Sequence, residues 1–429
     1  MPTRLLSLRS RVAALLVAVI ALWCAVRNAA ADDPLLTPPG IAKVEPLELK
    51  DGDRVVLLGG TLIEREQHYG YLEAGLVSRF PGRKITVRNL AWSGDTVWGE
   101  ARAGFGTPAD GFKQLVAQVT AAEPTVILAQ YGGNEAFAGP DGLDRFRAGL
   151  GTLLDALAAT KARIYLLSPL RHENLGPPLP DPAAHNANLQ LYCDTIGQIA
   201  AQRHIPYVDL FRSIVFQELA SPTIRLTDNG IHLTAVGYWR ATPRILAALG
   251  LPEEPWSVSI DGLTGQVTKT TGTEVVDVTR TADRLKFRLR DRLLPESRAP
   301  AGAPEISLVN RARMRVLTVT GLGGAWTLAI DGKTLDTCTG EDWAVGIVGI
   351  DGPEVDQADK LRRQIVAKDE LFFHRWRPQN ETYLFGFRKH EQGNNAVEIP
   401  QFDPLVTSKD QRITELAEPV EHVYEMFPK

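Results

Sequence analysis

Four short segments of the chain combine glycines with hydroxyl, amide or imidazole side chains. They are Leu57–Ile63, Asn89–Thr96, Tyr131–Glu135 and Thr227–Thr234. Transfer of an acyl group requires an oxygen nucleophile, a base that takes its proton, and hydrogen-bond donors aimed at the developing oxyanion. The hydroxyl of Thr61, the amide of Asn134 and the imidazole of His232 are groups of these kinds. They could do this chemistry only if the fold brought them into one cleft.

The elements that would position these segments lie between Asp53 and about Leu251, where short apolar runs alternate with helical periods. Buried strands are expected at 55–58, 85–90, 126–130, 164–168 and 207–210. Helices are expected near 68–79, 110–121, 143–157, 184–203 and 234–249. This alternation predicts parallel strands with right-handed crossovers, and hence a three-layer α/β domain. Ligands of such sheets bind at the carboxyl ends of the strands, which is where the first three segments lie.

Taken together, the four segments resemble the SGNH, or GDSL, hydrolase superfamily, in family order and over residues 53–250. The resemblance implies a flavodoxin-like parallel sheet and hydrolysis of esters. It also implies that a serine after the first strand is the nucleophile, that a glycine and an asparagine stabilise the oxyanion, and that a D-x-x-H motif supplies acid and base. Carried over to this sequence, Gly94 and Asn134 are the oxyanion donors and His232 is the base.

Two positions depart from the family pattern. The G-D-S of the family reads Gly59-Gly60-Thr61, so Thr61 stands at the nucleophile position, and the acid of D-x-x-H is replaced by Asn229. Threonine keeps the hydroxyl, but its β-methyl stiffens the side chain, so a slower nucleophile is expected. An amide at the acid position can favour the wrong imidazole tautomer, and in serine proteases this substitution costs ~10⁴ in kcat. Asp228 could compensate if its loop turns it toward His232.

Each of these residues also has a structural interpretation. Gly59 and Gly60 could form a tight turn, with Thr61 as the N-cap of a helix and Glu64 completing a capping box. Asn134 could be a turn residue, and His232 could be a buried structural histidine. The family order of the segments favours the site interpretation.

The remainder of the chain divides into two further parts. The α/β domain is expected over 32–252, an antiparallel, β-rich module over 253–345, and a C-terminal helix with an extended tail, packing back on the first domain, over 346–429. Expected strands of the module include 256–260, 274–279, 284–290, 314–320 and 326–330, with a hairpin turn at Asp331-Gly332. Basic residues alternate with apolar ones from Leu285 to Arg292, which indicates either a solvated strand face or a surface for an anionic glycan.

The N-terminus indicates export to the periplasm or the extracellular space. Residues 1–31 combine arginines, an apolar run too short to span a membrane stably, and an alanine-rich cleavage site, which is typical of a signal peptide. Its removal leaves 43 basic against 51 acidic residues, a charge of about −8, so no nucleic-acid partner is expected. Cys193 and Cys338 could form a disulfide or remain free. No spacing typical of a metal site occurs, and no cofactor is expected.

Two functions are compatible with these residues. The first is an exported ester hydrolase, acting on O-acyl (acetyl) esters of carbohydrates, in which Thr61 attacks and Asp228 or Asn229 orients His232. Its substrate would be a small-molecule or polysaccharide ester, and the carbohydrate preference rests on family analogy and export. The alternative is a catalytically impaired homologue that binds carbohydrate, which the exchanges at Thr61 and Asn229 favour.

Overall fold

The computed structural model describes residues 45–216, 225–301, 303, 315–391, 393 and 395–429. The expected signal peptide at 1–31 lies outside the described residues. Among the helices that are described, none is both long and apolar enough to cross a bilayer.

The predicted parallel sheet is confirmed. It consists of β1 (Arg54–Gly59), β2 (Thr86–Asn89), β3 (Val126–Gln130), β4 (Arg163–Leu167) and β5 (Tyr207–Val208). All four neighbouring pairs are parallel and the order is β2-β1-β3-β4-β5, the flavodoxin-like order. The carboxyl ends of the strands therefore share one edge, from which the candidate segments extend.

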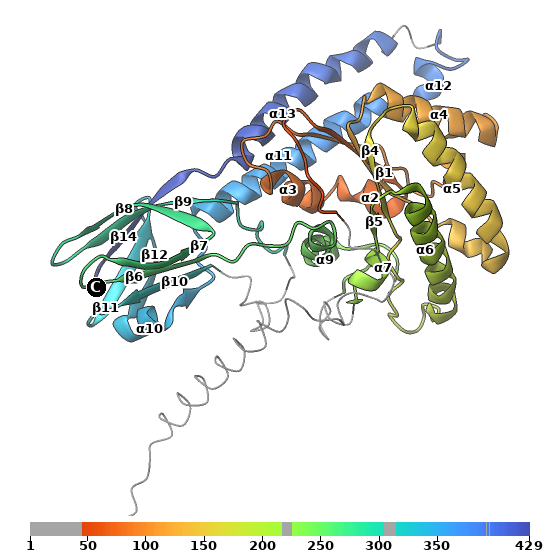
Figure 1. The fold of residues 1–429 in the computed structure, drawn as a ribbon. Helices are drawn as coiled ribbons and strands as arrows, with labels where there is room; N and C mark the ends of the chain where they lie inside the picture. Colours follow the sequence, from red (N-terminus) through yellow and green to blue (C-terminus); the bar gives the residue numbers. More distant parts are fainter. Residues whose placement is uncertain (1–44, 217–224, 302, 304–314, 392, 394) are drawn as a thin grey trace, which may run out of the picture. The chain divides into compact units, whose positions relative to one another are not determined.

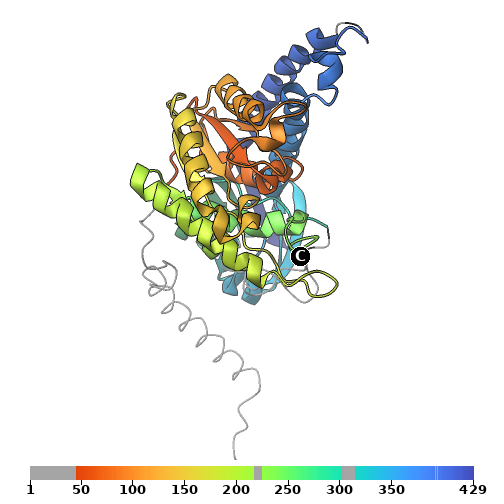
Figure 2. The same cartoon turned by 90° about the vertical axis from the view of Figure 1, so that its right-hand side faces the viewer.

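Helices cover both faces of this sheet, as a three-layer domain requires (Figure 1). On β1, Val55 and Leu57 belong to one buried cluster and Val56 and Leu58 to another, because successive side chains of a strand point to opposite faces. The first cluster includes residues of α3 (Tyr71–Ser78) and α9 (Ala235–Ala248). The second includes residues of α4 (Pro108–Ala121), α5 (Leu143–Ala158) and α6 (Ala183–Arg203). Helices α5 and α6 lie side by side in both views (Figures 1 and 2).

Short elements complete the α/β domain. They are α2 (Thr61–Glu66), α7 (Leu210–Ser213) and the 3₁₀ helices η1 (Glu100–Arg102), η2 (Glu135–Ala138) and η3 (Pro140–Gly142). The buried Cys193 of α6 and the partly buried Cys338 are both free thiols, so the two cysteines do not form a disulfide.

The β-rich module contains two sheets around one apolar core. The first has the order β13-β10-β6-β7, and the second has the order β12-β11-β14-β9-β8. The strands are β6 (Ser257–Asp261), β7 (Val267–Thr271), β8 (Thr273–Arg280), β9 (Leu285–Asp291), β10 (Val316–Thr320), β11 (Ala325–Ile330), β12 (Lys333–Thr339), β13 (Ile347–Val348) and β14 (Glu421–Pro428). Helix α10 (Gly340–Val345) follows β12. The second sheet is antiparallel throughout, whereas β6 and β10 pair in parallel. The predicted hairpin turn is confirmed, since Asp331 and Gly332 join β11 to β12 with positive φ angles.

The C-terminal segment contains more regular structure than the expected helix and extended tail. After α11 (Pro353–Trp376) come α12 (Glu381–Leu384), η5 (Asn395–Gln401), α13 (Phe402–Ala417) and the strand β14. Helices α11 and α13 pack against each other and against α3, so they extend one layer of the α/β domain. Strand β14 then lies between β9 and β11 in the module. The domain boundaries expected from the sequence remain a prediction.

Candidate active site

A cleft of about 650 Å³, open to solvent, lies at the carboxyl edge of the parallel sheet. Thr61, Asn134 and His232 all line it, although they are up to 171 positions apart in the sequence. Gly94 is not among its lining residues, but the adjacent Asp95 is. The fold therefore brings a hydroxyl, an amide and an imidazole to one cavity.

Thr61 is the first residue of α2, and the preceding Gly60 is the N-cap. The interpretation of Thr61 as an N-cap within a capping box is therefore wrong. Glu64 instead accepts hydrogen bonds from Arg377, at 2.7 Å, and from the hydroxyl of Ser93.

A glycine is required at position 59 by a close approach. Gly59 has φ +149°, and a Cβ atom there would lie 2.3 Å from the carbonyl oxygen of Gln130. At Gly60 a Cβ atom would lie 3.4 Å from Nδ2 of Asn134, an ordinary contact distance. Gly59 thus lets the chain turn from β1 toward α2.

The expected oxyanion donors differ in how they are held. Nδ2 of Asn134 donates to the carbonyl oxygen of Asp95 at 2.6 Å, which fixes the amide and leaves its second hydrogen available. Gly94 has φ +77°, in the left-handed region that favours glycine, and a Cβ atom there would meet open space. The glycine at this position is therefore explained by backbone conformation and not by crowding.

His232 lies in a turn closed by a backbone bridge between Thr227 and Leu233. Its Nδ1 is 3.3 Å from Nδ2 of Asn229 and 3.9 Å from Oδ1 of Asp228. Burial lowers the pKa of His232, the charge of Arg65 lowers it further, and Asp228 acts in the opposite direction. The imidazole is therefore neutral at physiological pH, as a general base must be.

The orientation of the Asn229 amide determines which tautomer of His232 it favours. Oδ1 of Asn229 accepts the backbone N–H groups of Ile231, at 3.1 Å, and His232, at 2.9 Å. Nδ2 therefore faces Nδ1 of the imidazole, and an amide nitrogen can only donate. This contact favours the proton on Nε2, whereas a base that acts through Nε2 needs its proton on Nδ1. Asn229 thus fixes the turn but disfavours the tautomer that catalysis requires.

Asp228 is the nearby group that could accept a hydrogen bond from Nδ1. Its carboxylate is also paired with Arg65, with 3.0 Å between Nη2 and Oδ2. At 3.9 Å from the imidazole it is too far for a hydrogen bond in this arrangement. A small rotation of the side chain would be needed.

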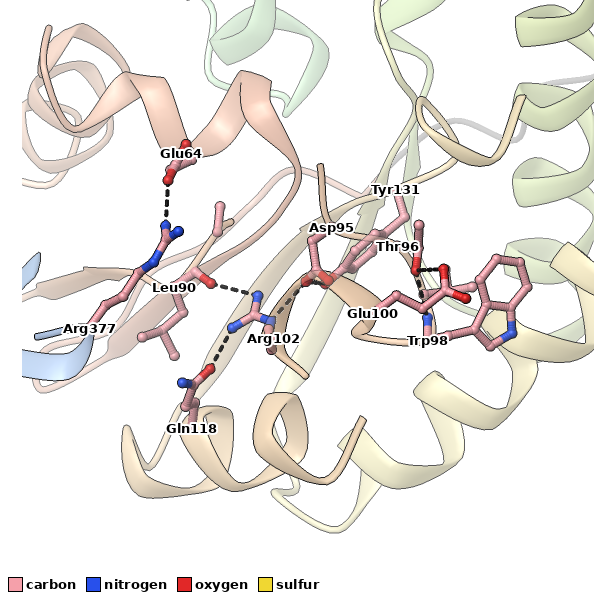
Figure 3. A network of polar contacts seen from close by, with 12 residues as sticks. Glu64, Leu90, Asp95, Thr96, Trp98, Glu100, Arg102, Gln118, Tyr131 and Arg377 are labelled. Carbon is pink, nitrogen blue, oxygen red and sulfur yellow. Dashed lines mark hydrogen bonds and ion pairs between the residues drawn. The ribbon is translucent and has the colours of Figure 1, made fainter. Parts of the chain in front are cut away.

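A buried polar network supports the loop that carries Gly94 (Figure 3). Nε of Arg102 donates to Asp95 at 2.8 Å, and the same guanidinium donates to Gln118, at 2.6 Å, and to the carbonyl oxygen of Leu90, at 2.8 Å. Burial raises the pKa of Asp95, and Arg102 opposes that effect. Because Asp95 also accepts from Asn134 through its backbone, the network links the second and third segments.

Glu135 provides another link between these segments. Its two carboxylate oxygens accept the backbone N–H groups of Val97 and Gly132, both at 2.9 Å. Burial raises its pKa to about 7. Its two hydrogen bonds hold the loops of the second and third segments together.

The sequence analysis missed a second imidazole in the cleft. His172 lines the cavity from the loop after β4, where its backbone N–H and carbonyl are both bound by the side chain of Asn186, at 2.7 and 2.9 Å. Burial lowers its pKa to about 4, with further contributions from His185 and His232. His172 could have been predicted as a site residue, because it follows the expected strand β4 and ligands bind beyond the carboxyl ends of such strands.

A flavodoxin-like sheet with a hydroxyl, an imidazole and an amide at its carboxyl edge is typical of ester hydrolases of the SGNH type. The model of the GDSL-like Lipase/Acylhydrolase family matches residues 59–240. The match lies within the α/β domain and supports an ester hydrolase. No curated protein sequence matches the chain.

Several solved structures are similar to this chain at low sequence identity. BT4096, a gut microbial diltiazem-metabolizing enzyme, is 17% identical with a TM-score of 0.69, and the match covers 91% of this chain and 100% of that one. A catalytic mutant of Axe2, an acetylxylan esterase from Geobacillus stearothermophilus, is 18% identical with a TM-score of 0.38, covering 48% and 97%. LAE5, an alpha/beta hydrolase enzyme from the metagenome of Lake Arreo, Spain, is 20% identical with a TM-score of 0.36, covering 47% and 97%. The likeness to BT4096 shows that the α/β domain, the β-rich module and the C-terminal helices recur together as one fold.

Proposed function

We propose that this protein is an exported hydrolase of O-acyl esters of carbohydrates, of which acetyl esters are the simplest, and that it works by acyl transfer to Thr61. The observation that carries the proposal is the convergence of Thr61, Asn134 and His232 on one cleft within a domain that matches the model of an ester-hydrolase family. The expected signal peptide supports export, and the carbohydrate substrate follows from export and family resemblance.

In the proposed reaction, the hydroxyl oxygen of Thr61 attacks the acyl carbon while its proton passes to Nε2 of His232. The oxyanion accepts hydrogen bonds from the backbone N–H of Gly94 and from Nδ2 of Asn134, each worth ~2.7–4 kcal/mol in comparable sites. The alcohol leaves with the proton of the imidazolium. Water then attacks the acyl-threonine, with His232 again as base, and releases the acid and Thr61.

Asp228 is the residue that orients His232 in this proposal. It is an anion near Nδ1 and can accept a hydrogen bond, whereas Asn229 presents a donor. Asp228 also stabilises the imidazolium, which an amide cannot do. Because Arg65 competes for the same carboxylate, a modest rate is expected.

The decisive experiment compares variants of Thr61 with 4-nitrophenyl acetate as substrate. Thr61→Ala should abolish turnover, because the attacking oxygen is removed, and Thr61→Ser should retain or exceed it, because only the β-methyl is removed. Thr270→Ala, on an exposed position of β7, is the matched control and should keep the full rate. Turnover that persists in Thr61→Ala would exclude the nucleophile role.

The contact between Asn229 and His232 favours a second candidate function, a carbohydrate-binding protein without hydrolytic activity. A wild-type protein that binds an acetylated glycan and leaves its ester intact would support it.

The basic face of β9 adds little to either function. Lys286 pairs with Glu425, at 2.7 Å, and Arg288 pairs with Glu421, at 2.8 Å, so the charge available for an anionic glycan is largely neutralised.

A further inference from the structure

Three aromatic rings pack together beside the cleft, and two of them, Phe137 and His172, line it. The ring centroids of Phe137 and His185 are 4.1 Å apart with an interplanar angle of 27°, and those of His172 and His185 are 4.5 Å apart at 34°. The rings come from three separate elements: η2, the loop after β4, and the first turn of α6. We refer to Phe137, His172 and His185 as the aromatic shelf.

The shelf adjoins the candidate catalytic groups. Phe137 and His172 line the same cavity as Thr61 and His232. Phe137 follows Asn134 by one turn of η2, since its backbone N–H donates to the Asn134 carbonyl oxygen at 3.3 Å. A substrate whose acyl group reached Thr61 would therefore have the shelf beside its other end.

Two features of the shelf do not contribute to the stability of the fold. The side chain of Phe137 is 66% exposed, although it is a large apolar group. Nε2 of His185 is buried and has no hydrogen-bond partner among the described residues. Departures of this kind are expected where residues serve binding and not folding.

The shelf is also uncharged near neutral pH. Burial lowers the pKa of His172 to about 4 and lowers that of His185 as well. It therefore offers flat apolar faces whose edges carry neutral nitrogen atoms. An anionic ligand gains nothing from such a surface, whereas a neutral ring with one apolar face and several hydroxyl groups matches both features.

We infer that the aromatic shelf is a subsite that holds the pyranose ring of the alcohol part of the ester, stacked on Phe137 and hydrogen-bonded to the imidazole of His172. This inference rests on the proposed function and extends it, because it assigns the selection of the sugar to specific residues. The shelf then contributes to substrate binding, while Thr61, His232 and the oxyanion donors act on the acyl group.

The test compares two acetate esters that differ only in the alcohol. Phe137→Ala should lower kcat/KM about 3- to 10-fold for an O-acetylated methyl pyranoside, mainly through KM, because an aromatic stacking contact of ordinary strength is lost. It should leave kcat/KM for ethyl acetate unchanged. Phe137→Trp should restore kcat/KM for the sugar ester. Phe105→Ala, a matched control at a phenylalanine that is 91% exposed elsewhere, should affect neither substrate. Equal losses on both esters, or none on either, would overturn the inference.

A binding measurement separates this inference from the proposed function. Binding of the unacetylated methyl pyranoside, followed by NMR line broadening, does not require catalysis. Weaker binding by Phe137→Ala than by the wild type would support the shelf even if no ester were hydrolysed. Equal binding by the two proteins would refute the shelf even if the enzyme proved active.

Discussion

The replacement Asn229→Asp should increase the rate of ester hydrolysis. In the present structure Nδ2 of Asn229 faces Nδ1 of His232 at 3.3 Å and favours the proton on Nε2. An aspartate in the same conformation would keep one oxygen on the two backbone N–H groups that Oδ1 now accepts. Its other oxygen would accept a hydrogen bond from Nδ1, so the tautomer needed for base catalysis would become the favoured one.

The expected gain follows from two distances. At a fixed dielectric constant the Coulomb energy varies as the inverse of the distance, so a carboxylate 3.9 Å from the imidazolium already gives most of the charge effect of one at 3.3 Å. The difference lies in the hydrogen bond, because 3.9 Å is too long for one. A charge-assisted hydrogen bond contributes ~1.5–3 kcal/mol, which corresponds to an increase of about 10- to 100-fold in kcat.

A double-mutant cycle with 4-nitrophenyl acetate tests this reasoning. Asp228→Asn should cost most of the rate in the wild type but little in the Asn229→Asp variant, because the new carboxylate takes over. The ¹⁵N chemical shifts of His232 should show Nδ1 unprotonated in the wild type and protonated in Asn229→Asp. They should also show a higher pKa in the variant, because the carboxylate stabilises the imidazolium.

Two results would refute the argument. If Asn229→Asp acquired the Nδ1-protonated tautomer and kcat did not rise, His232 would not be the base. If Asp228→Asn had the same small effect in both backgrounds, Asp228 would not orient the imidazole.

Two further predictions concern stability. Glu66 is buried with one oxygen lacking a partner among the described residues, and burial raises its pKa well above the ordinary value, so the folded protein takes up a proton. Stability should therefore fall as pH rises above the ordinary carboxyl pKa. The urea midpoint should fall between pH 5 and pH 9 in the wild type and fall less in Glu66→Gln. An equal fall in the two proteins would contradict this. The carboxylates of Glu73 and Asp369 are buried, 2.6 and 2.8 Å from Nζ of Lys368. Lys368→Met would leave them without their cation, so the free energy of unfolding in urea should fall by about 3–5 kcal/mol. Lys360→Met, at an exposed position of the same helix, should change it little. Equal effects at the two lysines would show that the buried pairs contribute nothing.

The central sheet could be predicted because most of its strands are short apolar runs, bounded by polar or turn residues, that alternate with helical periods. Several helices could not, and α2 and α13 illustrate why. Helix α2 has six residues, too few for a helical period to be visible. Helix α13 buries only Val406, Ile413, Leu416 and Ala417 over sixteen residues, so its apolar face is sparse.

Strand β14 was missed because its buried face is not apolar throughout. His422, Tyr424 and Met426 point into the module, whereas Val423 lies on the opposite face. His422 is accommodated by a contact of 2.6 Å with Asp331, which comes from a distant turn. An alternation that depends on such a partner cannot be recognised from the strand alone.

The candidate site shows a similar division. The segments that converge were predictable, because each follows a strand or precedes a helix and the carboxyl ends of parallel strands share one edge. The orientation of the Asn229 amide could not be predicted, because it depends on two backbone N–H groups of the folded turn. The roles assigned to Thr61, Gly94, Asn134, His232, Asp228 and Asn229 remain predictions until kinetic data test them.

The C-terminal helices are part of the α/β domain, although the family match ends at residue 240. Leu361, Ile365 and Ile413 belong to the same buried cluster as β1, and Lys368 of α11 donates to the carbonyl oxygen of Val87 at 3.0 Å. At the end of α11, the guanidinium of Arg377 lies 3.4 Å from the ring centroid of Trp92. The same guanidinium donates to Glu64 (Figure 3). Trp92 precedes the loop of Gly94, and Glu64 follows Thr61 by one helical turn. The positions of the candidate nucleophile and of an oxyanion donor therefore depend on a helix that begins more than a hundred residues beyond the family match, so a fragment ending at residue 252 should lose both its packing and the geometry of the cleft.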